Sequence, residues 1–224
     1  KKLVIFSRDE LKQFELSMKY NEKDYPNIRF FLGDIRDQDR LNRALEEIDI
    51  VVHAAALKQV PSCEFYPMEA VKTNIQGTVN VLESARKNDI ELVINTSTSE
   101  TYGSAIYTPI DELHPLQGQS PYSASKISAD KLAESYYNSF KTPVITVRPF
   151  NTYGPRQSSR AVIPTIISQL LTEDKLILGD LSPVRDFTYV EDTANGFIFA
   201  ANNHEHVGEV INLGYGKASS IGEI

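Results

Sequence analysis

The sequence predicts an α/β fold in which helices cover both faces of a doubly wound, mostly parallel sheet. Short apolar runs rich in Val, Ile and Phe alternate along the chain with longer stretches of helical periodicity. A strand, a helix and a second strand in succession form a right-handed crossover, and repeated crossovers build a parallel sheet covered on both faces. The 224 residues, 41% of them hydrophobic and 24% charged, suffice for one large domain or two small ones.

Each expected strand is a run of β-branched, aromatic or leucine side chains: 3–6, 29–32, 48–53, 92–95 and 144–147. Each expected helix repeats its apolar residues every three or four positions: 9–19, 38–47, 68–88, 121–139, 161–172 and 192–202. The nearly continuous apolar run at 48–52 is typical of a strand buried on both faces. After Val147, the segment 148–156 contains two Pro and one Gly, which indicates a loop and the start of a second, smaller lobe.

The composition argues against several classes of function. A net charge of -7 and a pI near 5.2 disfavour nucleic acid or an anionic membrane as the main partner. The single cysteine, Cys63, cannot form a disulfide within the chain, and no apolar run approaches the roughly 18 residues that a membrane-spanning helix needs. The four histidines lack the spacing of metal ligands. We therefore expect a cytoplasmic protein with no metal site and no membrane partner.

Tyr122 and Lys126 are the first candidates for chemistry. Their spacing of four places both side chains on one helical face, where an ammonium group can lower the pKa of a nearby phenol and make it a base. The same short pattern also occurs as a half-buried tyrosine and a solvated lysine on an amphipathic helix. Thr98, just after the strand at 92–95, could supply the hydroxyl that orients a substrate oxygen beside the tyrosine.

Thr98, Tyr122 and Lys126, together with "HAAA" at 53–56 and "RPFNTYGPRQ" at 148–157, resemble the extended short-chain dehydrogenase/reductase family of NAD-dependent epimerases and dehydratases. The resemblance implies a Rossmann-type dinucleotide-binding domain over 1–153 and a partial substrate-binding lobe over 154–224, interleaved with it. It also implies a nucleotide-sugar substrate, a bound NAD(P) and a homodimer or higher homo-oligomer. No Gly-rich turn precedes Leu3, so we expect that the first strand of the domain and its pyrophosphate-binding turn have been lost.

Several residues match the family's cofactor contacts. Ser7 and Arg8, at the end of the first expected strand, should contact the adenosine ribose. A hydroxyl followed by Arg suits the 2'-phosphate of NADP and therefore favours NADP over NAD. The acidic Asp9 would instead suit the free 2'-hydroxyl of NAD. Asp34 with Ile35 matches the adenine contact, although Asp34 could instead cap the next helix. The resemblance also assigns cofactor contacts to four small or polar residues and the catalytic pair: Ala54, Ala55, Ala56, Asn74, Tyr122 and Lys126.

The reaction is indicated by the residues after Thr98. Typical 4,6-dehydratases follow this threonine with an Asp-Glu pair, whereas this chain has Ser99 and Glu100. The first half resembles inverting UDP-N-acetylglucosamine 4,6-dehydratases and the second half resembles retaining enzymes of the legionaminic type. The resemblance implies a dehydratase of the UDP-N-acetylglucosamine class, in which Tyr122 removes the O4 proton and Glu100 the C5 proton.

The substrate contacts expected from the resemblance are Lys58, Asn151, Arg160 and Arg185. Three alternatives stay open: a UDP-glucuronate decarboxylase, a nucleotide-sugar epimerase on the same scaffold, and a non-catalytic nucleotide-binding fragment.

Overall fold

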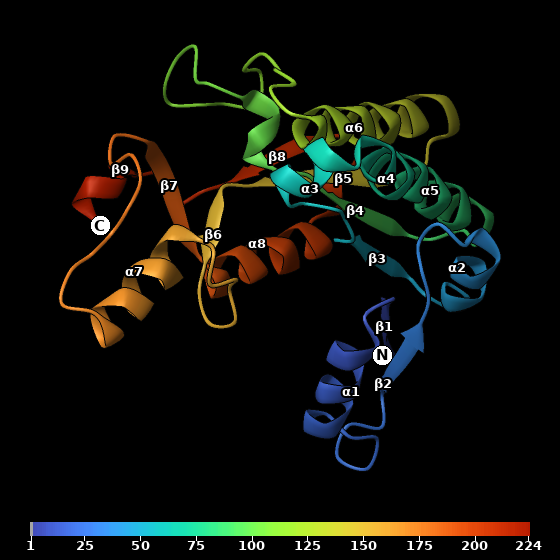
Figure 1. The fold of residues 1–224 in the computed structure, drawn as a ribbon. Helices are drawn as coiled ribbons and strands as arrows, with labels where there is room; N and C mark the ends of the chain where they lie inside the picture. Colours follow the sequence, from blue (N-terminus) through green and yellow to red (C-terminus); the bar gives the residue numbers. More distant parts are fainter. Residues whose placement is uncertain (1) are drawn as a thin grey trace.

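The computed structural model describes residues 2–224 and has the expected α/β architecture (Figure 1). Its strands are β1 (Leu3–Ser7), β2 (Ile28–Leu32), β3 (Ile50–His53), β4 (Leu92–Thr96), β5 (Val144–Pro149), β6 (Asn151–Tyr153), β7 (Val184–Tyr189), β8 (Val210–Leu213) and β9 (Ala218–Ser220). Its α-helices are α1 (Glu10–Lys19), α2 (Gln38–Ala44), α3 (Val60–Phe65), α4 (Pro67–Ala70), α5 (Gly77–Lys87), α6 (Pro121–Phe140), α7 (Val162–Thr172) and α8 (Val190–Asn202).

The centre of the molecule is a parallel sheet with the strand order β3-β4-β5-β8. Helices α5 and α6 cover one face and α8 covers the other, as Figure 1 shows. Side chains of β4 alternate between two apolar clusters: Val93 packs with α5 and α6, whereas Leu92 and Ile94 pack against the side of α8. Because both faces of the sheet are covered, the doubly wound fold class is confirmed.

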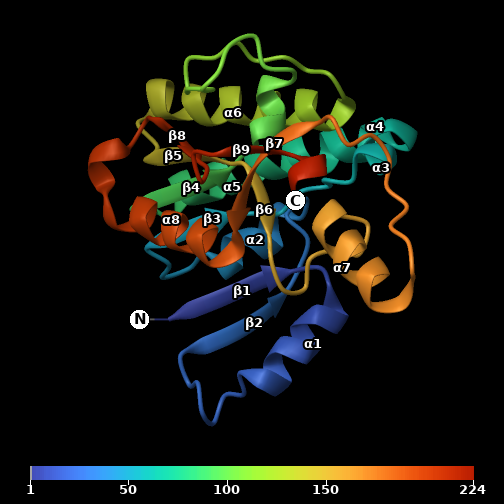
Figure 2. The ribbon, with the colours of Figure 1, turned by 90° about the vertical axis from the view of Figure 1, so that its left-hand side faces the viewer.

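The first two strands form a separate parallel pair, β1-β2, which lies with α1 to one side of the central sheet (Figure 2). Within the described residues, β3 pairs only with β4 and is therefore an edge strand. Val52 of β3 is 51% exposed, so the expectation that the run at 48–52 is buried on both faces is wrong. Its apolar composition is that of an inner strand, but its burial depends on neighbours that composition does not reveal.

The helix expected at 68–88 is interrupted. After α4, a π-helical segment, Val71–Gln76, precedes α5, and a further short helix, α3, comes before Pro67. A π-helical turn widens the backbone by one residue and is common at functional sites. Here it contains Asn74, whose contacts are described below.

The second part of the chain forms the small sheet β6-β7-β9 and then returns to the main sheet through β8. The two parts are thus interleaved in space, while the division at residue 153 stays a prediction. The strands β6 to β9 were not expected from the sequence, because none of them is a continuous apolar run. Among residues 2–224, the structure contains no helix long and apolar enough to cross a membrane.

Candidate functional site

The site lies at the carboxyl ends of the parallel strands, where α/β sheets bind their ligands. Thr98 follows β4 and caps a short 3₁₀ turn, Ser99–Tyr102, with its hydroxyl accepting a hydrogen bond from the Glu100 amide at 3.3 Å. Tyr122 is in the first turn of α6, which begins with a capping box between Ser120 and Ser123. The side chains of Thr98 and Glu100 both act on the Tyr122 phenol, so the structure brings these three residues together.

The pKa of Tyr122 differs from the expectation. Burial and the nearby Glu100 carboxylate together raise it to about 12, although a hydrogen bond with Thr98 acts in the opposite direction. The Nζ of Lys126 donates to the Thr96 carbonyl at 2.7 Å, and Lys126 is not among the groups that shift the pKa of the phenol. The expectation that Lys126 lowers the pKa of Tyr122 is therefore wrong for the protein alone, because desolvation of the phenol outweighs a cation that is directed elsewhere.

Lys126 is itself buried, with 2% of its surface exposed. Burial lowers its pKa and the charge of Asp130, one helical turn further on, raises it. The carboxylate of Asp130 accepts hydrogen bonds from Ser97 at 2.8 Å and from Arg148 Nε at 3.0 Å. The carboxylate that acts on the Lys126 ammonium is therefore itself ion-paired with Arg148.

Asn74 has no unused amide group with which to bind a cofactor. Its Oδ1 accepts from the Leu57 amide at 2.7 Å, and its Nδ2 donates to the Leu57 carbonyl and to the Ser125 hydroxyl, both at 2.9 Å. These bonds join the loop after β3 to α6. The contact expected between Asn74 and cofactor stays a prediction, and the hydrogen bonds of Asn74 instead hold the loop that carries Ala54 to Ala56.

The loop after β3 has the form expected of a ligand-facing surface. Ala54 and Ala55 are exposed at the strand end rather than packed in the core, and their small side chains leave room for a ligand to approach the backbone. At the end of β4, the buried Thr96 Oγ1 has no hydrogen-bond partner among the described residues. A nicotinamide cofactor fits here, because the edge combines open backbone with an unpaired polar atom.

The residues expected at the adenosine end lie at the ends of β1 and β2. Ser7 Oγ accepts from the Asp9 amide at 3.1 Å, and Asp9 caps α1 through the Lys12 amide. Arg8 is exposed and lies 3.3 Å from Asp34. Asp37, not Asp34, caps α2.

Burial alone would raise the pKa of Asp34, but hydrogen bonds from Arg36 and Arg8 lower it to about 2. The side chain of Ile35 is 7% exposed and packs in the core beside Leu41, so a contact between Ile35 and cofactor, which stays a prediction, would have to use its backbone. Of its backbone groups, the carbonyl already accepts from Asn80 Nδ2 at 2.9 Å.

Three of the four expected substrate residues line one cavity of about 390 Å³. Asn151 comes from β6, Arg160 from the loop before α7 and Arg185 from β7. Lys58 is exposed on the loop after β3 and does not line this cavity. Further lining residues that the sequence did not indicate include Thr165, Phe187 and Ile221, which are brought in by tertiary packing.

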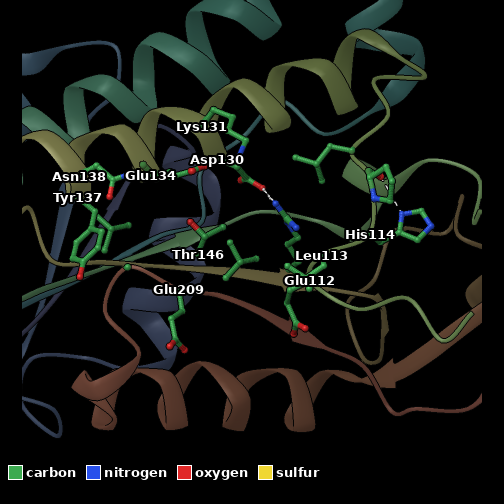
Figure 3. Close-up of a pocket in the computed structure, with 17 residues that line it drawn as sticks. Glu112, Leu113, His114, Asp130, Lys131, Glu134, Tyr137, Asn138, Thr146 and Glu209 are labelled. Atoms are coloured by element: carbon green, nitrogen blue, oxygen red, sulfur yellow. Dashed lines mark hydrogen bonds and ion pairs between the residues drawn. The ribbon is translucent and has the colours of Figure 1, made fainter. Parts of the chain in front are cut away.

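A second cavity, of about 640 Å³, lies beneath α6 and was not expected. Figure 3 shows Asp130 at its wall together with Glu112, Glu134 and Glu209. The buried partner of Asp130 is Arg148, which also contacts Tyr102. The position of Asp130, four residues after Lys126, was the one available sequence signal for this network.

Comparisons with known proteins agree with this geometry. Residues 7–214 match the model of the NAD dependent epimerase/dehydratase family. An inverting UDP-N-acetylglucosamine 4,6-dehydratase of Campylobacter jejuni is 35% identical over 93% of this chain and 58% of its own length. A UDP-glucose 4-epimerase of Rickettsia conorii is 36% identical over 94% of this chain and 56% of its own length. The chain thus spans less than two thirds of either relative.

A solved structure gives the same result for the fold. The UDP-glucuronic acid 4-epimerase of Bacillus cereus, in complex with UDP-glucuronic acid and NAD, superposes with a TM-score of 0.86 and 29% identity. The superposition covers 99% of this chain and 72% of that protein.

Proposed function

Because this chain belongs to the NAD dependent epimerase/dehydratase family, we propose that it is a sugar-nucleotide 4,6-dehydratase of the UDP-N-acetylglucosamine class. The observation that carries the proposal is the carboxylate of Glu100, which lies close enough to Tyr122 to raise the pKa of its phenol. Elimination of water needs a carboxylate beside the tyrosine base, to remove the C5 proton. Epimerisation, in which the keto sugar only turns over in the site, does not need one. The Campylobacter dehydratase among the relatives supports the substrate class.

In the proposed reaction, the side chains of Thr98 and Tyr122 hold the sugar O4, and Tyr122 removes its proton. A bound nicotinamide would take the hydrogen from C4 and return it to C6. The C4 ketone makes the C5 hydrogen acidic, and Glu100 removes that proton. Ser99 has no group acidic enough to protonate the departing C6 hydroxyl, so Glu100 delivers the same proton there and ends as a carboxylate again. Return of hydrogen to C6 leaves C5 one proton short, and the proton that Tyr122 took from O4 balances this proton uptake at C5.

The resident cofactor would be held by the loop at Ala54 to Ala56, by Lys126 and, at the adenosine end, by Ser7, Arg8 and Asp34. We propose NADP rather than NAD. Asp9, the residue that would favour a ribose hydroxyl, already caps α1, whereas the Arg8 side chain is half exposed. The cavity with Asn151, Arg160 and Arg185 would bind the nucleotide diphosphate, for which an arginine fork is suited. Lys58 stays a proposed contact of the sugar.

The proposal is tested by measuring whether the protein removes water from UDP-N-acetylglucosamine. The protein is incubated with UDP-N-acetylglucosamine and either NAD or NADP, and the products are analysed by mass spectrometry. We expect a product lighter by one water, which Glu100→Gln and Tyr122→Phe both suppress. Glu91→Gln is the matched control, because Glu91 precedes the opposite end of the same strand, β4. Undiminished dehydration by Glu100→Gln would refute the role of Glu100.

A 4-epimerase is the second candidate, because the Rickettsia epimerase matches this chain as closely as the dehydratase does. An epimerase would convert UDP-N-acetylglucosamine or UDP-glucose into an isomer of unchanged mass. UDP-glucuronate serves as a third substrate, because a decarboxylase would release carbon dioxide from it. The three outcomes are distinct in the same experiment.

A further inference from the structure

We propose that Arg148 is a positioning residue that fixes the turn carrying Glu100 against the helix carrying Tyr122, by binding Asp130 on one side and Tyr102 on the other. The role of Glu100 in this inference rests on the proposed function, whereas the contacts themselves do not. Arg148 belongs to β5, and only 3% of its surface is exposed. Its side chain lies between two segments that are far from it in sequence.

The contact with α6 is a buried ion pair. Arg148 Nε and Nη2 both lie 3.0 Å from Asp130 Oδ2. Asp130 is one helical turn after Lys126 and two turns after Tyr122, so the guanidinium is tied to the helix that carries the base. Ser97, just before Thr98, donates to the same carboxylate oxygen at 2.8 Å.

The contact with the turn is made through Tyr102, the last residue of the 3₁₀ turn that contains Glu100. Arg148 Nη1 donates to the Tyr102 hydroxyl at 2.9 Å, and this hydroxyl donates to Asn212 Oδ1 at 2.7 Å. The Tyr102 ring has no exposed surface, and the guanidinium carbon lies 4.9 Å from its centroid. The position of Glu100 is thus linked to β5 and β8.

Arginine is suited to this position because its planar guanidinium offers five donors in a fixed arrangement. A lysine could neutralise Asp130 but could not reach the hydroxyl of Tyr102 in the same geometry. Burial of an ion pair adds little to stability when compared with well-packed apolar residues. This arrangement is therefore better explained by the geometry that it imposes on Glu100 than by stability.

The effect can be measured without cofactor or substrate, through the influence of Glu100 on Tyr122. The charged or titratable groups that act on the Tyr122 phenol are Glu100, Cys63 and Asp130, and Thr98 hydrogen-bonds to it. Those that act on the Tyr102 hydroxyl are Arg148 and Glu112. If Arg148 and Tyr102 hold Glu100 in place, the effect of Glu100 on the pKa of Tyr122 must depend on the Tyr102 hydroxyl.

The experiment is a double-mutant cycle on the whole chain labelled with 3-fluorotyrosine, whose fluorine lowers the pKa of the phenol into a range that ¹⁹F NMR can titrate. The signal of Tyr122 is identified by its absence in Tyr122→Phe. We expect Glu100→Gln to lower the pKa of Tyr122, because it removes a neighbouring negative charge. In the Tyr102→Phe background, and equally in Arg148→Lys, we expect this decrease to shrink by more than half.

Tyr107→Phe is the matched control. Tyr107 is on the same connection between β4 and α6, and its hydroxyl donates to Asp111 at 2.7 Å, away from Arg148. The full decrease should persist in that background. The inference is overturned if the decrease is the same in Tyr102→Phe as in the unmodified protein, if Tyr107→Phe abolishes it equally, or if Glu100→Gln has no effect on Tyr122. Absence of dehydratase activity would refute the proposed function and leave this cycle intact.

Discussion

Asn74 offers a sharp test of how the loop after β3, a proposed cofactor contact, is held, because its three hydrogen bonds join this loop to α6. Asn74 is 1% exposed and bonds to both backbone groups of Leu57 and to Ser125. In Asn74→Ala all three bonds are lost. At a net contribution of about 1 kcal/mol per bond, we expect the free energy of unfolding to fall by roughly 3 kcal/mol.

Asn80→Ala is the matched control for this prediction. Asn80 is also buried, one and a half helical turns later, but it makes one hydrogen bond, to the Ile35 carbonyl at 2.9 Å. We expect it to cost about 1 kcal/mol. The higher helix propensity of alanine, up to about 0.7 kcal/mol, affects both variants alike and cancels in the comparison.

The assay is urea unfolding followed by circular dichroism, and the predicted difference between the two variants is about 2 kcal/mol. A second readout is the affinity for added nicotinamide dinucleotide, which should fall further in Asn74→Ala than in Asn80→Ala. Equal destabilisation by the two substitutions would refute the reasoning, because the loop would then not depend on the Asn74 amide.

Three further predictions concern charge. Burial lowers the pKa of His53 to about 3, and Thr78, which donates to the Asn74 carbonyl, accepts from His53 Nε2 at 3.0 Å. The unfolded imidazole takes up a proton below about pH 6.5, whereas the buried one does so only near pH 3. The contribution of buried, neutral His53 to stability is therefore complete above about pH 6.5 and declines as the pH falls toward about 3. NMR should show no titration of His53 between about pH 8 and pH 5. At the proposed cofactor-binding site, Arg8→Ala should weaken NADP binding about tenfold more than NAD binding, as measured by calorimetry, and equal losses would contradict the proposed 2'-phosphate contact. In the cavity proposed to bind substrate, Arg185→Ala should weaken UDP binding about tenfold, whereas Lys175→Ala, outside the cavity lining, should leave the affinity unchanged.

The local pattern of apolar residues in the sequence predicted several helices close to their observed positions. Helices at 9–19, 121–139 and 161–172 were expected within two residues of α1, α6 and α7, because amphipathic periodicity and capping residues act over a few positions. The helix expected at 68–88 was less accurate, since it contains a π-helical turn in which Asn74 bonds to Leu57 and Ser125. Such a bond is invisible to a sequence window.

Burial and charge partners were less accessible from the sequence. The i, i+4 rule places Tyr122 and Lys126 on one helical face, but it does not say that Lys126 donates to the Thr96 carbonyl or that desolvation raises the pKa of Tyr122. Likewise, the exposure of Val52 follows from the position of β3 at a sheet edge and not from its own side chain.

The sequence by itself determined the α/β fold class and the chemical groups of the candidate site, because periodicity and short motifs are local properties of the chain. Only the tertiary structure decided how those groups are held. Tyr102, Asp130, Arg148 and Asn212 are separated by up to 110 residues, yet they form one buried network. Hydrogen bonds and desolvation depend on neighbours in space, and those neighbours exist only once the strands have paired.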